Sequence, residues 1–197
     1  MTRPFITLFI LLVWLPAAHA QNWLKLCEKA TTTVSGYEDR KVCLTYHNHL
    51  DDTGKLVYSA ALREVLARNI EGHETRTLMI LVPLGALLEP GLRASIFPKG
   101  LWEKVENNET PDAANLKEIA LKYTLCRADG CVAEAEAKPE LITDLKDGGG
   151  LMVRPAAIGT YPIPLKGFAD ALAGPHRELP QQLKRCDQGN WPGCKDR

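Results

Sequence analysis

Residues 119–137 read IALKYTLCRADGCVAEAEA, and this stretch decides the fold of the chain. From Ile119 to Cys126, large apolar residues alternate with small or polar ones, which is the period of two of a half-buried β-strand. Asp129-Gly130 is a turn dipeptide, and the same alternation resumes after it at Cys131. The stretch therefore predicts a β-hairpin that carries one cysteine on each side of its turn.

Shorter apolar runs predict further strands outside this hairpin. Residues 77–82 form a continuous apolar run, consistent with a strand that is buried on both faces. Weaker strand patterns lie at 41–46 and 151–154. Several short strands separated by Gly and Pro turns are typical of a sandwich. We therefore predict a mainly β fold, an antiparallel β-sandwich with one or two short helices.

Three segments have the apolar spacing of a helix. By periodicity alone, residues 58–70 predict an amphipathic helix, because their apolar residues recur every three or four positions. A short helix is predicted over Pro139–Lys146, with proline at its first position and three glycines at 148–150 to end it. A second is predicted over Leu165–Ala173, before Gly174. Helix and strand both remain open for residues 58–70.

The first twenty residues have the three parts of a cleavable export signal. Arg3 provides the positive charge, residues 5–15 are a nearly unbroken apolar run, and Ala18-His19-Ala20 fits an A-x-A cleavage site. We therefore predict a signal peptide (1–20), one β-sandwich domain (21–174), and a C-terminal tail (175–197). The expected location is the periplasm, the cell surface or the medium.

All six cysteines follow the expected cleavage site, which predicts a disulfide-stabilised protein. An oxidising compartment favours disulfides over metal or redox chemistry, and a redox centre usually has the tighter C-x-x-C spacing. Sequence alone cannot choose among the possible pairings. Locality favours Cys27 with Cys43, Cys126 with Cys131, and Cys186 with Cys194.

Charge and hydropathy argue against two classes of partner. The chain has 24 basic and 24 acidic side chains, so without Arg3 the exported part has 23 against 24. Such a balance gives no electrostatic attraction to nucleic acid or to an anionic membrane. After the signal, the longest apolar stretch is 78–88, which is interrupted by Pro83 and Gly85 and is shorter than the ~20 residues of a spanning helix. No transmembrane anchor is expected.

Several short motifs occur in a recognisable order along the chain. They are Trp23 with Cys27, Val42-Cys43-Leu44, Pro83-Leu84-Gly85 with Pro90-Gly91, Cys126 with Gly130-Cys131-Val132-Ala133-Glu134, and Leu165-Lys166-Gly167-Phe168. Together they resemble the signature of the invasion-associated locus B family, from about residue 23 to 172. The resemblance implies an exported alphaproteobacterial protein, built as a β-sandwich and named for a contribution to host-cell invasion.

The resemblance also bears on individual segments. It implies that residues 57–66 form a strand, despite their helical spacing. Relatives usually carry an aspartate soon after the strand that follows Pro-Leu-Gly, whereas this chain has Phe97-Pro98 and then a polar insertion. The tail with Cys186 and Cys194 lies beyond the shared region.

Few residues indicate catalysis or metal binding. On a strand, His47 and His49 would share a face, as a metal pair might, but no third ligand is evident nearby, so we interpret them as solvent-facing. Glu134 and Glu136 also share a face, most simply the solvated face of the hairpin. The serines lack the context of a nucleophile elbow. We predict no catalytic residue, no metal site and no cofactor.

The leading functional hypothesis is an exported, non-enzymatic accessory or binding protein. The polar segment Pro98–Asn115 is predicted to be a long surface loop that supplies specificity. The expected partner is a protein of the envelope or of a host cell. One alternative is a periplasmic enzyme or metal-binding protein that uses His47 and His49. Another is a structural envelope protein that assembles through an exposed strand edge.

Overall fold

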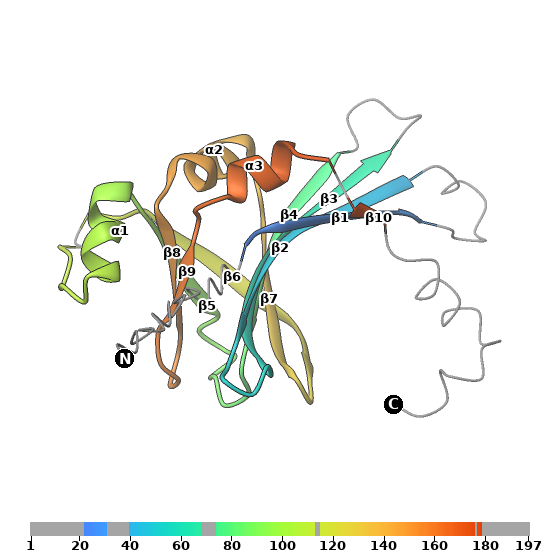
Figure 1. Cartoon of the computed structure of the whole chain (residues 1–197). Helices are drawn as coiled ribbons and strands as arrows, with labels where there is room; N and C mark the ends of the chain where they lie inside the picture. The colour runs from blue at the N-terminus through green and yellow to red at the C-terminus, as the bar shows by residue number, and fades with distance from the viewer. Residues whose placement is uncertain (1–21, 31–39, 68–73, 113–114, 176, 179–197) are drawn as a thin grey trace, which may run out of the picture.

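The computed structural model describes residues 22–30, 40–67, 74–112, 115–175 and 177–178 (Figure 1). The predicted signal peptide and the tail cysteines Cys186 and Cys194 lie outside these ranges. The elements, in chain order, are β1 (Leu24–Ala30), β2 (Arg40–Leu50), β3 (Leu56–Ala67), β4 (Thr75–Val82), β5 (Leu92–Phe97), α1 (Lys99–Glu106), β6 (Glu118–Arg127), β7 (Gly130–Glu136), α2 (Pro139–Asp147), β8 (Gly150–Pro155), β9 (Tyr161–Pro164), α3 (Phe168–Ala173) and β10 (Arg177–Glu178).

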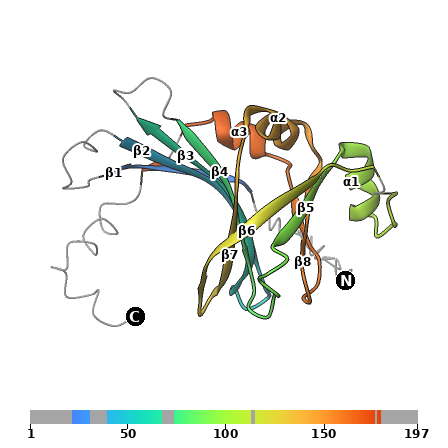
Figure 2. The same cartoon turned by 180° about the vertical axis from the view of Figure 1, so that it is seen from behind.

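All ten strands belong to one curled sheet with the order β10-β1-β2-β3-β4-β7-β6-β5-β8-β9. Every pairing is antiparallel except that of β1 with β10. The strand β6 joins the two halves, because its first residues pair with β5 and its last residues pair with β7. The two halves turn toward each other around this strand (Figures 1 and 2). The predicted mainly β, antiparallel fold is thus confirmed, and its two layers are halves of one sheet.

The hairpin predicted at residues 119–137 is present as β6 and β7. Cys126 lies opposite Cys131, and Arg127 lies opposite Gly130 at the turn. A register shift between Tyr123 and Leu125 interrupts the ladder. This irregularity lies just beyond the point where β6 passes from one half of the sheet to the other, as expected of a bulge that bends a strand.

Residues 56–67 form the strand β3, so the helix predicted there from periodicity alone is wrong and the strand implied by the family resemblance is confirmed. β3 pairs with β2 along one edge and with β4 along the other. Ala60, Leu62 and Glu64 are buried on the inner face; Arg63 is half-buried, and the small Ala61 is buried as well. Long-range pairing on both edges outweighs the helical spacing of the apolar residues.

The strand predicted at 77–82 exists as β4, but it is not buried on both faces. Leu78, Ile80 and Val82 are buried, whereas Thr77, Met79 and Leu81 are only half-buried. No described helix covers the outer side of this half of the sheet (Figures 1 and 2). The outer positions of β4 therefore remain partly open to solvent despite their apolar character.

Two helices were predicted and both are present. α2 begins at Pro139 and ends at Asp147, before Gly148. α3 is shorter than predicted, because it starts at Phe168 and not at Leu165. Gly167, at its N-cap, has φ +85°, a backbone conformation that glycine adopts readily and other residues rarely do.

The prediction that Pro98–Asn115 is a surface loop throughout is wrong, because residues 99–106 form the helix α1. Leu101, Trp102 and Val105 supply its apolar side, and Trp102 is only 6 % exposed. A Cβ atom at Gly150 would overlap the Trp102 ring, and one at Gly149 would lie 2.6 Å from Trp102 Cβ. The polar composition of the segment conceals these three apolar residues, which have helical spacing.

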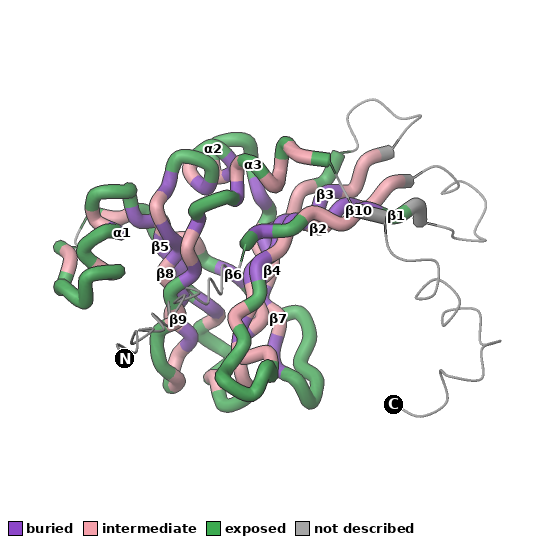
Figure 3. The backbone as a smooth tube through the Cα atoms, in the orientation of Figure 1, coloured by how far each residue is buried: buried purple, intermediate pink, exposed green. Residues whose placement is uncertain are grey.

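The core fills the concave side of the sheet and joins both halves (Figure 3). Its fully buried side chains include Leu62 and Ile80 from one half and Leu92, Val153 and Ile163 from the other. Two hydrogen bonds connect opposite sides of the curl. Trp23 Nε1 donates to the Pro164 carbonyl oxygen and Tyr58 Oη donates to that of Pro162, both at 2.8 Å. The indole and phenol thus hold β9 against β1 and β3.

The structure contains the Cys27–Cys43 and Cys126–Cys131 disulfides, the two described pairings that locality favoured. Each one joins residues that lie directly opposite each other on neighbouring strands. Cys27 and Cys43 are buried, whereas Cys126 is exposed at the hairpin end. One disulfide therefore lies in the interior and the other reaches the surface.

Candidate functional site

The two histidines share the inner face of β2, where His47 is buried and His49 is partly exposed. His47 is 1 % exposed, with its ring centroid 5.5 Å from that of Trp23, so the solvent-facing interpretation is wrong for this residue. Trp23 and Phe168, which pack edge to face, cover this part of β2. His49 is partly exposed and stacks on Tyr58 at 4.4 Å. Each imidazole thus packs against an aromatic ring.

No metal centre accompanies these histidines in the part of the chain that the structure describes. There, no group of three or more His, Cys, Asp and Glu side chains is placed to hold an ion. Protein zinc sites take three or four such ligands. The metal-binding alternative therefore has no further ligand to draw on among the described residues.

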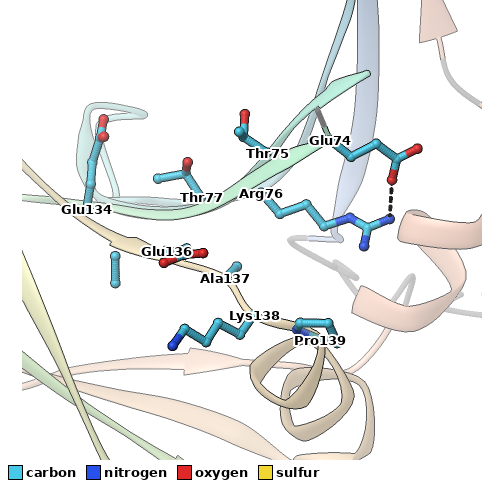
Figure 4. A pocket seen from close by; sticks show the side chains of 10 residues that line it. Glu74, Thr75, Arg76, Thr77, Glu134, Glu136, Ala137, Lys138 and Pro139 are labelled. Carbon is cyan, nitrogen blue, oxygen red and sulfur yellow. Dashed lines mark hydrogen bonds and ion pairs between the residues drawn. The ribbon is translucent and has the colours of Figure 1, made fainter. Parts of the chain in front are cut away.

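A polar hollow of about 450 Å³ lies where β4 begins and β7 ends (Figure 4). Its lining comprises Glu74, Thr75, Arg76, Thr77, Glu134, Ala135, Glu136, Ala137, Lys138 and Pro139. The two glutamates singled out in the sequence, Glu134 and Glu136, are thus brought to one hollow. No histidine, cysteine or serine belongs to this lining.

Several charges of this hollow are already paired within the protein. Arg76 lies 3.2 Å from Glu64 and 3.3 Å from Glu74, and Figure 4 shows its contact with Glu74. Glu134 lies 3.5 Å from Arg63 on the neighbouring strand. These contacts orient the side chains toward each other. We do not assign a reaction to this hollow.

A second hollow is an apolar groove between the start of β6 and the helix α2. Its volume is about 350 Å³, and Ile96, Pro98, Leu116, Ile119 and Leu141 form its apolar lining. Four of these five side chains are half-buried, and Pro98 is exposed. The remaining lining residues are Asn115, Lys117, Asp144, Asp147 and Gly148. The groove thus has an apolar floor and a polar rim, as ligand sites commonly do.

The rim of the groove is acidic on the side of α2. Lys117 Nζ lies 3.6 Å from Asp144 Oδ2, and their side chains are 74 % and 44 % exposed. Such an open ion pair contributes at most about 1 kcal/mol. Asp147, at the end of the same helix, is also exposed. A cationic group from a ligand could therefore displace Lys117 at little cost and meet both aspartates.

The sequence located the ends of this groove but not its floor. Pro98 and Asn115, the bounds of the segment predicted to supply specificity, both line it, whereas α1 between them does not. Ile119 and Leu141 were assigned to a strand and to the apolar face of a helix. In α2 only Ile142 and Leu145 are buried, so that face is wider than the core needs. The extra apolar residue Leu141 is the sequence feature that could have indicated the groove.

Comparisons with known proteins identify a family and related solved structures. The model of the family described as "Invasion associated locus B (IalB) protein" matches residues 23–176. A crystal structure of invasion associated protein B from Bartonella henselae is similar over 85 % of this chain and 93 % of that chain, with 17 % identity and a TM-score of 0.49. No curated protein with a similar sequence was found.

No described helix is both long and apolar enough to cross a membrane. The family match includes both described disulfides, the strands β1 to β9 and the groove. It extends over most of the chain, from Trp23 to the beginning of the tail. The chain therefore belongs to the invasion associated locus B (IalB) protein family.

Proposed function

We propose that this protein is exported and acts as a non-enzymatic binding protein that holds a segment of a protein partner in the apolar groove. The observation that carries the proposal is a groove with a half-buried apolar floor beside an acidic rim. Export is supported by the signal-like first twenty residues and by two disulfides, which form and persist in oxidising compartments.

The groove defines the chemistry of its partner. Ile119 and Leu141 offer an apolar floor to an aliphatic or aromatic side chain, and a groove of about 350 Å³ holds such an anchor. Asp144 and Asp147 favour lysine or arginine beside that anchor. The partner is thus an exposed peptide segment with a large apolar residue next to basic ones, on an envelope protein or on a host cell.

The family description supports a place for this binding in host-cell invasion. In this proposal the protein is an adaptor: the rigid, disulfide-linked sheet presents the groove, and the partner supplies any activity.

The test uses the chain from Gln21 onward, which includes every described element. Synthetic peptides with one leucine or phenylalanine followed by two lysines are compared with peptides that carry two aspartates there, by fluorescence anisotropy. We expect at least tenfold tighter binding of the basic peptides. The D144N/D147N double variant should remove that preference.

The matched variants lie on one strand. Ile119→Ser removes an apolar side chain from the groove floor, and we expect it to abolish binding. Leu125→Ser changes an exposed leucine of the same strand outside the groove and should leave binding unchanged. Equal loss in both variants, or equal affinity for basic and acidic peptides, contradicts the proposal. A photo-cross-linking residue at Leu116 should then identify the natural partner.

A further inference from the structure

The C-terminal tail of this protein carries the combination of side chains that fits the apolar groove. Leu183 is followed directly by Lys184 and Arg185. From Gln21 onward, the ranges outside the described residues contain no other place where a large apolar residue adjoins two basic ones. Residues 179–197 as a whole have four basic and two acidic side chains. The charge of the tail is therefore opposite to that of the groove rim on the side of α2.

The groove has a matching place for each part of such a segment. The half-buried side chains of Ile119 and Leu141 form an apolar floor for a leucine. Asp144 and Asp147 both line the groove and are three residues apart on α2, so they are neighbours on the same side of the helix. Lysine and arginine have long side chains, so two consecutive ones can reach both carboxylates while the preceding leucine enters the groove.

The tail begins far from the groove of its own chain. It follows β10, which pairs with β1 at Leu26 and Cys27. In Figure 1, β10 lies on one side of α3 and α2, and α1, whose start adjoins the groove at Pro98, lies on the other side. Two helices side by side span about 20 Å, whereas the five residues from Glu178 to Leu183 reach at most about 18 Å when fully extended. This reach favours the groove of a second copy.

We propose that Leu183, Lys184 and Arg185 of one copy of this protein bind in the apolar groove of a second copy. The inference rests on the proposed function of the groove and adds that the tail competes there with an outside partner. Each copy has one tail and one groove, so the contact is heterologous, and further copies join until a ring closes. Self-association therefore fills the groove, whereas the dissociated protein offers it to other partners.

Sedimentation velocity of the chain from Gln21 onward, over a range of protein concentrations, tests this contact. We expect the parent protein to associate as its concentration rises. The K184D/R185D variant reverses the charge of the tail, and the D144K/D147K variant reverses that of the rim. Each alone should need at least tenfold higher concentration to associate. An equimolar mixture of the two should associate again, because each groove then meets a tail of opposite charge.

The matched control is K195D/R197D, which reverses the other two basic residues of the same tail and should associate like the parent. A parent that stays monomeric, a mixture that does not associate, or equal loss in the control would overturn the inference. It is also overturned if the parent is monomeric and K184D/R185D binds basic peptides more tightly, because the tail then occupies the groove of its own chain.

The groove proposal and the tail proposal fail separately. A monomeric parent that binds the basic peptides and prefers them to acidic ones keeps the groove proposal and removes the tail contact. Asp144 and Asp147 are both open to solvent, with 44 % of the Asp144 side chain exposed. The melting temperature of D144K/D147K should therefore match that of the parent, so that lost association reflects the changed charge of the rim.

Discussion

Glu64 shows how a single charged residue is accommodated on the inner face of the sheet. Its side chain is 10 % exposed and lies between Lys25 Nζ, at 3.3 Å, and Arg76 Nε, at 3.2 Å. Lys25 also donates to the Leu172 carbonyl oxygen at 2.6 Å, which connects the pair to α3. Glu118 has the same arrangement at the surface, between Arg93 and Arg154, but is 46 % exposed.

Replacing Glu64 by alanine should therefore cost far more stability than replacing Glu118. Removal of Glu64 leaves two partly buried cations beside each other, and we expect a loss of about 2 to 3 kcal/mol in the free energy of unfolding. For Glu118→Ala we expect less than about 1 kcal/mol. Urea denaturation of both variants measures the difference. Similar losses would show that burial does not distinguish the two clusters.

Tyr58 gives the protein a pH dependence in the alkaline range. Burial raises the pKa of Tyr58 to about 12, from its usual 10.0, with a smaller contribution from Tyr161. Below pH 10 the phenol is protonated in both the folded and the unfolded chain. Between about pH 10 and 12 only the unfolded chain releases the proton, so stability should fall as pH rises. The loss is complete once the folded form also ionises.

Ultraviolet titration should show one tyrosine that ionises near pH 12. Tyr58→Phe should remove this step and flatten the fall of the melting temperature between pH 10 and 12. The same variant loses the hydrogen bond to Pro162, so it should be less stable by about 1 kcal/mol at pH 7. An unchanged alkaline slope in Tyr58→Phe would show that another group controls it.

At the scale of elements, the local sequence pattern was enough to predict two paired strands when those strands are close in sequence. The β6–β7 hairpin could be predicted because alternation and the Asp129-Gly130 turn agree. β3 could not be recognised from periodicity, because its pairing with β2 and β4 decides its conformation. α1 was missed because its three apolar residues lie in an otherwise polar segment, and the packing partners of Trp102 lie near residue 150.

The contact between Trp102 and Gly150 can be tested by comparing two glycine substitutions. A Cβ atom at Gly150 would overlap the Trp102 ring, whereas one at Gly100, in α1 itself, would meet nothing within 4 Å. We expect Gly150→Ala to lower the free energy of unfolding by at least about 2 kcal/mol. Gly100→Ala should raise it by up to about 1 kcal/mol, because alanine favours helix. Thermal unfolding of both variants tests whether α1 is packed in this way.

The two described disulfides should differ in their accessibility to reductants. Cys27 and Cys43 are 5 % and 2 % exposed, whereas Cys126 is exposed beside the hairpin turn. Thiol–disulfide exchange requires access of the attacking thiolate. Under native conditions, a mild thiol should therefore reduce Cys126–Cys131 first. Alkylation followed by mass spectrometry measures the order, and simultaneous labelling of all four cysteines would indicate global opening.

For the whole molecule, the groove and the β4–β5 connection (residues 83–91) differ in how far the sequence could reveal them. The connection is continuous in sequence, and its Pro83-Leu84-Gly85 start was visible as a motif. The groove combines residues from β5, the segment before β6, and α2, which pairing alone brings together. Its bounds were found in Pro98 and Asn115, but the half-buried state of Ile119 and Leu141 depends on which neighbours cover them.

The sheet order also determines the sequence in which the strands can pair during folding. β1 to β4 pair consecutively and can pair before the rest of the chain is available. β4 and β5 follow each other in sequence, yet the β6–β7 hairpin separates them in the sheet, so β5 has no settled neighbour until that hairpin arrives. Until then β4 is an open edge with Leu78, Ile80 and Val82 uncovered. The folding chain is therefore most prone to aggregation in this interval.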